Sequence, residues 1–252
     1  MADTITENIN ETTKNYLDKQ GLKYYHELIQ KELDSLNSKI SALSLNMNMS
    51  LSASPATIER NKATNITIKA TINNKPETFT FESMTVFGSD VKGTISGNVG
   101  TWVENNVMLN SPASKTYNVE TLVGGIKFTG SKTVSAYWPM YSGFAAEKTE
   151  VVDGVVQHLG IPANGLTGLT YKLTSSAKTT YKVTQNAEGS LSFFILVPSG
   201  VTAPSAFSMG GADFAMSKTT TTYTVNNTDV TYTVFMSGGT YSTGKTLNIT
   251  AS

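Results

Sequence analysis

The stretch NITIKATI, residues 65–72, decides the fold class of this chain. Every second residue is apolar and every intervening residue is polar, and the apolar set is Ile66, Ile68, Ala70 and Ile72. Because successive side chains of a β-strand point to opposite faces, this alternation predicts a strand with one buried face and one solvated face. Similar short runs continue to the C-terminus, and no convincing helical pattern follows residue 47. We therefore expect a mainly β protein.

Turn residues divide the region around this stretch into short strands. Asn73-Asn74 predicts a hairpin turn, and a return strand containing Phe79 and Phe81 follows it. Glycines separate further predicted strands at 101–109, 117–122 and 126–134. Several short strands within residues 48–137 predict an immunoglobulin-like β-sandwich.

A second β-domain is expected over residues 138–252. Pro139 marks its boundary, and five glycines and prolines predict a loop-rich segment over 140–166. Six strands are predicted beyond this segment: 170–174, 180–185, 191–198, 221–226, 230–236 and 246–249. Asn226-Asn227 lies between two alternating strands and predicts a tight hairpin turn. We interpret this domain as a C-terminal β-sandwich.

N-terminal to the strands, the spacing of apolar residues changes from two to seven. Two sets of positions recur every seven residues: Leu22, Ile29, Leu36 and Leu43, and His26, Leu33, Ile40 and Met47. This repeat predicts an N-terminal α-helical coiled-coil stalk over residues 17–47, with Asp18 as its N-cap. The alternative is an amphipathic helix packed on its own domain. Mixed Leu and Ile at both seam positions is compatible with a homotrimer.

Composition excludes several classes of partner. The 252 residues contain 19 Lys and Arg and 19 Asp and Glu, so the formal net charge is zero. A neutral chain lacks the strongly basic surface that binds nucleic acids and anionic membranes, and we expect neither partner. No run approaches the roughly 18 apolar residues that predict membrane insertion, and the N-terminus does not resemble a secretory signal. The chain has no cysteine, which excludes disulfides and thiolate metal sites.

The titratable residues form no recognisable catalytic motif. The only histidines are His26 and His158, and neither a GxSxG nor an HExxH pattern is present. Glu147, Glu150 and Asp153 form a loose acidic group. A glycosidase needs two carboxylates that face each other across a cleft, whereas an acidic loop is usually just solvated. We expect no enzyme activity, no metal and no cofactor.

Aromatic residues give the candidate surface for binding. Tyr137, Trp138 and Tyr141 stand beside the segment expected to be loop-rich. Aromatic side chains in such a place could contact a glycan or a protein. Packing between the two β-domains is the alternative, and we favour it. Trp102, in contrast, is expected in the core of the first sandwich.

Three parts of the chain resemble phage proteins. YLDKQGLKYYHELIQKELDSLNSKI, residues 16–40, is similar to a helical segment of phage tail and fibre proteins. LSASPATIERNKATNITIKATI, residues 51–72, resembles the opening of immunoglobulin-like modules in Bacteroides-type phages and bacterial surface proteins. FFILVP (193–198), FSMGGADFAM (207–216) and YTVFMSGGTYSTGKTLNIT (232–250) resemble the C-terminal β-domains of fibre proteins in crAss-like and related phages.

The resemblance implies a trimeric structural protein of the virion, namely a head or tail fibre or a decoration. Residues 1–16 are polar, and we expect them to form an N-terminal arm that attaches to a capsid or tail protein, although a disordered tail is the alternative. Ile5 and Ile9 are the expected anchors, since residues four apart share one face of a helical turn. An adhesin that binds a host surface glycan or receptor is the alternative function, and a depolymerase is a third.

Overall fold

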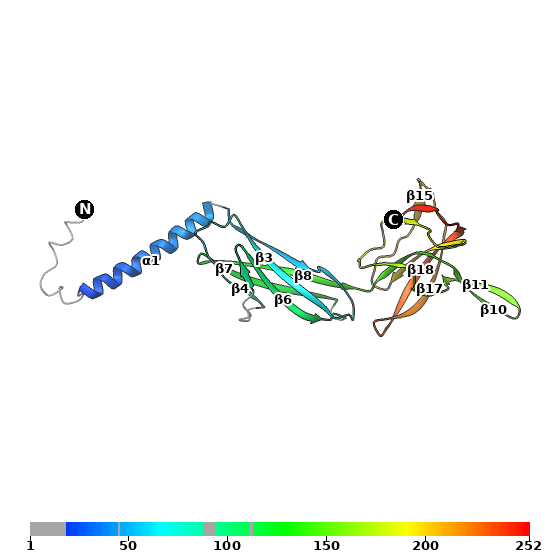
Figure 1. Cartoon of the computed structure of the whole chain (residues 1–252), viewed down its shortest axis with the longest axis horizontal. Coiled ribbons are helices and arrows are strands. Elements are labelled where there is room, and N and C mark those ends of the chain that lie inside the picture. The colour runs from blue at the N-terminus through cyan, green and yellow to red at the C-terminus, as the bar shows by residue number, and fades with distance from the viewer. Residues whose placement is uncertain (1–18, 45, 88–93, 111–112) are drawn as a thin grey trace. The chain divides into compact units, whose positions relative to one another are not determined.

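The computed structural model describes residues 19–44, 46–87, 94–110 and 113–252 (Figure 1). Within these ranges the chain forms one α-helix, α1 (Lys19–Ser44), and nineteen β-strands. The expected mainly β fold is therefore confirmed. The arm predicted over residues 1–16, with Ile5 and Ile9, lies outside the described residues.

The coiled-coil stalk expected over residues 17–47 is not observed, and that prediction is wrong. α1 is a single helix of 26 residues, and no second helix packs along it within the described part of the chain. Asn46 adopts the left-handed conformation, with a φ of 55°, so Met47 lies beyond the helix. Asparagine tolerates this conformation and commonly follows the end of a helix. The seven-residue spacing located the helix, but any helix with one apolar face shows similar spacing.

Two four-stranded sheets form the first β-sandwich. One sheet has the order β1 (Asn48–Ser54), β3 (Thr64–Asn73), β6 (Val99–Val107) and β5 (Thr94–Ser96). The other has the order β2 (Thr57–Glu59), β8 (Ile126–Tyr137), β7 (Ser114–Val123) and β4 (Phe81–Val86). With β1 and β2 taken as the two halves of strand A, these orders match the ABED and CFG sheets of an immunoglobulin-like fold.

The first sandwich is filled by the inward faces of its strands. Ile66, Ile68, Ala70 and Ile72 of β3 are all buried, as their alternation predicted. Gly100 of β6 faces the opposite sheet, because an added Cβ there would lie 2.7 Å from the sulfur of Met84 and 2.9 Å from the Phe81 ring. Trp102 is only half-buried and stands edge-on to Phe87, at 6.2 Å between ring centroids.

The hairpin expected at Asn73-Asn74 does not form. Asn74 does adopt a turn conformation, with a φ of 55°. However, β3 and β4 belong to different sheets, so the chain crosses the sandwich between them. The ammonium group of Lys75 stabilises this crossing by donating to the backbone oxygen of Phe79 at 2.6 Å. A local turn signal does not determine which sheet receives the following strand.

A second sandwich contains the C-terminal strands. Its five-stranded sheet has the order β12 (Thr170–Lys172), β9 (Met140–Ala145), β14 (Leu191–Pro198), β18 (Thr228–Tyr241) and β17 (Met216–Val225). Its four-stranded sheet has the order β13 (Thr180–Thr184), β19 (Thr246–Ala251), β15 (Phe207–Met209) and β16 (Ala212–Asp213). The six strands predicted in this region are all present. Asn226 and Asn227 form the predicted turn between β17 and β18, with φ values of 48° and 59°.

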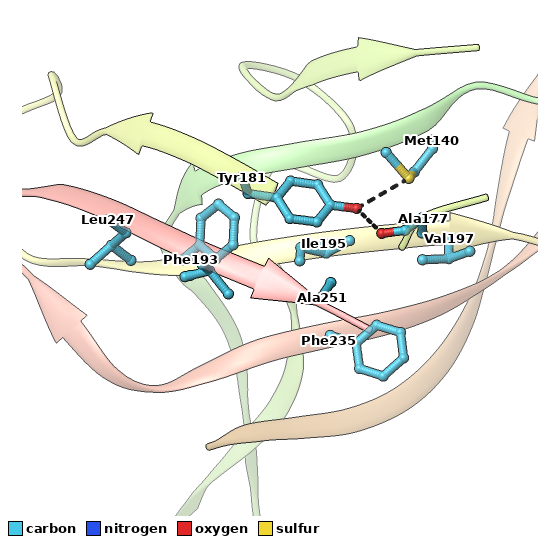
Figure 2. Close-up of a cluster of buried hydrophobic side chains, with 10 residues drawn as sticks. Met140, Ala177, Tyr181, Phe193, Ile195, Val197, Phe235, Leu247 and Ala251 are labelled. Atoms are coloured by element: carbon cyan, nitrogen blue, oxygen red, sulfur yellow. Dashed lines mark hydrogen bonds between the residues drawn. The ribbon is translucent and has the colours of Figure 1, made fainter. Parts of the chain in front are cut away.

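β14 is the central strand of this sandwich and is buried on both faces. Phe193, Ile195 and Val197 face the four-stranded sheet and pack with residues such as Tyr181 and Leu247 (Figure 2). Phe194 and Leu196 alternate with them and face a second apolar cluster on the other side. Burial of each such side chain stabilises the fold by about 1.5–3 kcal/mol. The apolar run that marked this strand in the sequence is thus explained by two separate cores.

Residues 140–166 are not the loop-rich segment that their glycines and prolines predicted. They contain β9 and an additional hairpin made of β10 (Glu147–Val152) and β11 (Val155–Pro162). The turn of this hairpin is Asp153-Gly154, and both residues have positive φ values, 53° and 78°. Asp-Gly favours a two-residue hairpin turn, because both residues accept the positive φ values that this turn requires. That signal was present in the sequence.

Candidate interaction surfaces

An exposed apolar face runs along α1. Five of the predicted oligomerisation residues are 48–58% exposed: Leu22, Ile29, Leu33, Leu36 and Ile40. Their spacing of seven, four, three and four residues places them on one side of the helix. A shallow groove of about 390 Å³ follows the same side between Leu28 and Lys39. We call these five residues the helix face.

The other three predicted oligomerisation residues are placed differently. His26 is exposed on α1, next to Leu22 and Ile29 along the same side of the helix. Leu43 belongs to α1, but its side chain lies outside the described residues. Met47 is half-buried in the connection between α1 and β1. The structure therefore gathers five aliphatic residues and one histidine on a surface that other side chains of the described chain leave open.

A second apolar surface lies at the tip of the β10–β11 hairpin. Val151, Val152, Val155 and Val156 are 43–69% exposed. They form two cross-strand pairs, Val151 with Val156 and Val152 with Val155. Adjacent pairs lie on opposite faces of a hairpin, so both faces of this tip are apolar. The sequence VVDGVV could have revealed this tip, but the expectation of a loop concealed it.

The acidic group of the sequence stabilises the same hairpin. Glu147 accepts a hydrogen bond from the backbone N–H of Gly160 at 2.8 Å, and its other carboxylate oxygen lies 2.9 Å from His158 Nδ1. Glu150 pairs with Lys148 at 3.2 Å, and Asp153 occupies the turn. Each carboxylate thus has its own position along the hairpin. Among the described residues, no group of three His, Asp or Glu could hold a metal ion.

The predicted aromatic surface is a packed junction. Trp138 is only 7% exposed and belongs to the apolar cluster behind β14. The Arg60 guanidinium lies 6.0 Å from the centroid of its ring. Tyr137 and Tyr141 are half-buried, and the Tyr141 ring lies 6.1 Å from that of Tyr232. These positions agree with packing, the interpretation that we favoured over an open binding surface.

Polar contacts complete this junction. Residues 53–67 and 132–252 belong to the same compact unit of the chain. Within it, Asn61 donates a hydrogen bond to Thr228 Oγ1 at 2.7 Å, which connects the end of β2 with the start of β18. The Tyr232 hydroxyl donates to the backbone oxygen of Pro139 at 2.9 Å. Burial raises the pKa of Tyr232, and nearby Tyr141 and Glu59 raise it further.

No described helix is long and apolar enough to cross a membrane. No protein-family model matches this sequence, and no curated protein matches it. The two sandwiches and the exposed surfaces of α1 and the β10–β11 hairpin are therefore the basis for a functional proposal.

Proposed function

We propose that this protein is a non-enzymatic structural component of a phage particle. In this proposal it forms a homotrimeric fibre or decoration, with its N-terminal arm attached to a capsid or tail protein and its C-terminal domain presented outward. The observation that carries the proposal is the helix face of α1. Two further considerations agree with it. One is the β-sandwich architecture, and the other is the resemblance of residues 16–40, 51–72, 193–198, 207–216 and 232–250 to segments of phage fibre proteins and immunoglobulin-like modules.

The helix face argues for association with other chains. Leaving a Leu or Ile side chain in water forgoes about 1.5–3 kcal/mol relative to burial. Five such residues along one side of a helix form a contiguous apolar patch, and patches of this kind mark interaction sites on soluble proteins. Tyr25, three residues after Leu22 and 52% exposed, borders this face and would enlarge the contact.

Other copies of this chain are the simplest partner for that surface. In a closed symmetric oligomer the same patch of each subunit is covered, so one apolar face supplies the whole interface. Two polar contacts of α1 lie along the helix itself: Lys23 pairs with Glu27 at 3.9 Å, and the Gln30 amide donates to Asp34 at 3.0 Å. These contacts do not compete with apolar association. We therefore propose a homo-oligomer whose subunits meet through α1.

The proposal is non-enzymatic because the carboxylates that the sequence grouped together have separate structural contacts along one hairpin. Glu147 stabilises the base of the β10–β11 hairpin, and Glu150 pairs with Lys148. Purified full-length protein should release no reducing ends from capsular or cell-wall polysaccharide. Turnover by a homogeneous sample would overturn this part of the proposal.

Two measurements test the structural role. Sedimentation velocity of the full-length protein at micromolar concentration should give a mass of three chains, and a stable monomer would contradict the homotrimer. In addition, the chain should be found in purified phage particles, at a position that gold-labelled antibodies against the C-terminal domain reveal by electron microscopy. Its absence from the particles would overturn the virion proposal whatever the oligomeric state.

A further inference from the structure

A groove lies between the free edges of the two sheets of the C-terminal sandwich. β12 is an edge strand of the five-stranded sheet, and β13 is an edge strand of the four-stranded sheet. The chain passes directly from one to the other through residues 173–179. The resulting hollow has a volume of about 600 Å³ and is lined by residues of β9, β12 and β13. We call it the edge groove.

The floor of the edge groove is held by the core. Tyr181 and Met140 contribute to the lining, and both are buried. The Tyr181 hydroxyl donates to the backbone oxygen of Ala177 at 2.8 Å and lies 3.6 Å from the sulfur of Met140 (Figure 2). The Tyr181 ring also stands edge-on to Phe193, at 6.2 Å between centroids. The floor is therefore formed before any ligand arrives.

The walls carry positive charge without a compensating carboxylate. Lys172 of β12 and Lys182 of β13 line the groove, and both are exposed. Lys172 is the cross-strand partner of Met140, so the two side chains lie on the same face of the sheet. Neither lysine forms an ion pair with a described residue, and no Asp or Glu is among the described residues that line the groove. A ligand with negative charge would therefore complement it.

Hydroxyl and amide groups account for much of the remaining lining. Thr170, Thr184 and Asn186 are exposed at its rim. A neighbouring hollow of about 290 Å³ shares these three residues and extends the groove toward Gly143 and Ala187. The larger hollow alone lies within the roughly 300–1,000 Å³ that is usual for ligand sites. An elongated ligand with several hydroxyl groups matches this lining better than a compact apolar one.

We propose that the edge groove binds an acidic oligosaccharide, with Lys172 and Lys182 contacting its carboxylates. The threonines and Asn186 would then bond to sugar hydroxyls. This binding activity goes beyond the structural role proposed above. It requires only the C-terminal sandwich, not the helix face.

An extended peptide is the competing occupant, because a strand can add to a free sheet edge. Two features oppose it. β12 has only three residues, which allow a very short ladder of backbone hydrogen bonds. Lysines on both edge strands are also the kind of residue that proteins use to prevent strand addition. The charge and hydroxyl content of the lining therefore favour the saccharide.

Isothermal titration calorimetry on the full-length protein tests the proposal. The probes are a hexamer of galacturonic acid, neutral maltohexaose and hexaglutamate, each titrated at low and at physiological salt. The acidic sugar should bind, and its affinity should exceed that of maltohexaose by about tenfold or more and fall as salt rises. Equal affinity for both sugars, or no binding of the acidic sugar at millimolar concentration, would overturn the proposal. Binding of hexaglutamate as tight as that of the acidic sugar would also overturn it, in favour of a peptide or of charge alone.

Substitutions locate the site. Lys172→Glu and Lys182→Glu should each weaken binding of the acidic hexamer by about tenfold or more. Lys69→Glu changes an exposed lysine of β3 in the same way and is the matched control, for which unchanged affinity is expected. If charge reversal lowers the melting temperature, the neutral variants Lys172→Gln and Lys182→Gln replace the glutamate variants in the binding measurement. Equal affinity for the groove variants and the control would place the site elsewhere. If the protein is a monomer that binds the sugar, the proposed homo-oligomer is contradicted and the binding site in the edge groove is supported.

Discussion

The side-chain amide of Asn226 donates a hydrogen bond to the carboxylate of Glu59 at 2.8 Å. The same amide nitrogen lies 2.9 Å from the backbone oxygen of Arg60. Asn226 belongs to the turn between β17 and β18, and Glu59 is the last residue of β2. A single side chain therefore connects the turn of the C-terminal sandwich with a strand of the first sandwich, within one compact unit.

This contact predicts a specific loss of stability. Asn226→Gly keeps the positive φ accessible but removes the amide, and it should lower the free energy of unfolding by about 1–3 kcal/mol, as expected for a hydrogen bond to a charged group. Asn226→Asp should cost more, because it places a second carboxylate beside Glu59. Urea denaturation followed by circular dichroism measures both.

Asn227→Gly is the matched control for the turn. Asn227 has a similar φ of 59° and is exposed. A change of at most about 0.5 kcal/mol is expected for this exposed position. If Asn226→Gly and Asn227→Gly unfold at the same urea concentration, the bond to Glu59 does not contribute to stability.

Removal of the Tyr223 hydroxyl group should stabilise the fold. Its hydroxyl oxygen is buried and has no hydrogen-bond partner among the described residues, whereas the hydroxyl of Tyr232, whose ring lies 5.8 Å away, donates to Pro139. Tyr223→Phe should therefore raise the free energy of unfolding by about 1 kcal/mol, and Tyr232→Phe should lower it by about 1 kcal/mol. Thermal and urea unfolding of the two variants provide the comparison. Opposite signs are expected, and a loss in Tyr223→Phe would reveal a partner for that hydroxyl.

Alkaline pH should destabilise the C-terminal sandwich. Burial raises the pKa of Tyr181 from 10.0 to about 12, because the charged phenolate is poorly solvated in the core. The stability linked to this group is fully present below pH 10, the value of the unfolded chain, and is lost as pH rises from 10 to about 12. The midpoint of urea unfolding should fall across that interval, and it should fall less in Tyr181→Phe. Identical pH dependence in both proteins would show that ionisation of Tyr181 does not destabilise the folded state.

A charge on the helix face should dissociate the oligomer. Leu33→Glu introduces a carboxylate at the middle of the apolar face, and its burial between subunits would be strongly unfavourable. Ser38→Glu adds the same charge, but at 100° per residue it lies on the opposite side of α1. Sedimentation velocity should show a monomer for Leu33→Glu and an unchanged oligomer for Ser38→Glu. Loss of the oligomer in both variants would indicate a general charge effect, and retention in both would place the interface elsewhere.

The local elements of this protein were largely predictable. The alternation in β3 and the apolar run of β14 located those strands, and Asn226-Asn227 located a hairpin turn, because strand periodicity and positive φ are properties of short segments. The hairpin at Asp153-Gly154 was missed because the glycines and prolines around it suggested a loop. The hairpin at Asn73-Asn74 was wrongly expected because the destination of the next strand depends on packing that the turn does not contain.

The candidate sites depended much more on tertiary structure. By itself, the sequence determined that the chain would be mainly β, that one helix would precede the strands, and that this helix would have an apolar face. Only the folded chain decided that Trp138 packs beneath Arg60, and that the edges bearing Lys172 and Lys182 border one groove. The physical reason is that side-chain periodicity is set by the local backbone, whereas the pairing of strands into sheets is set by burial of apolar surface between residues far apart in the chain.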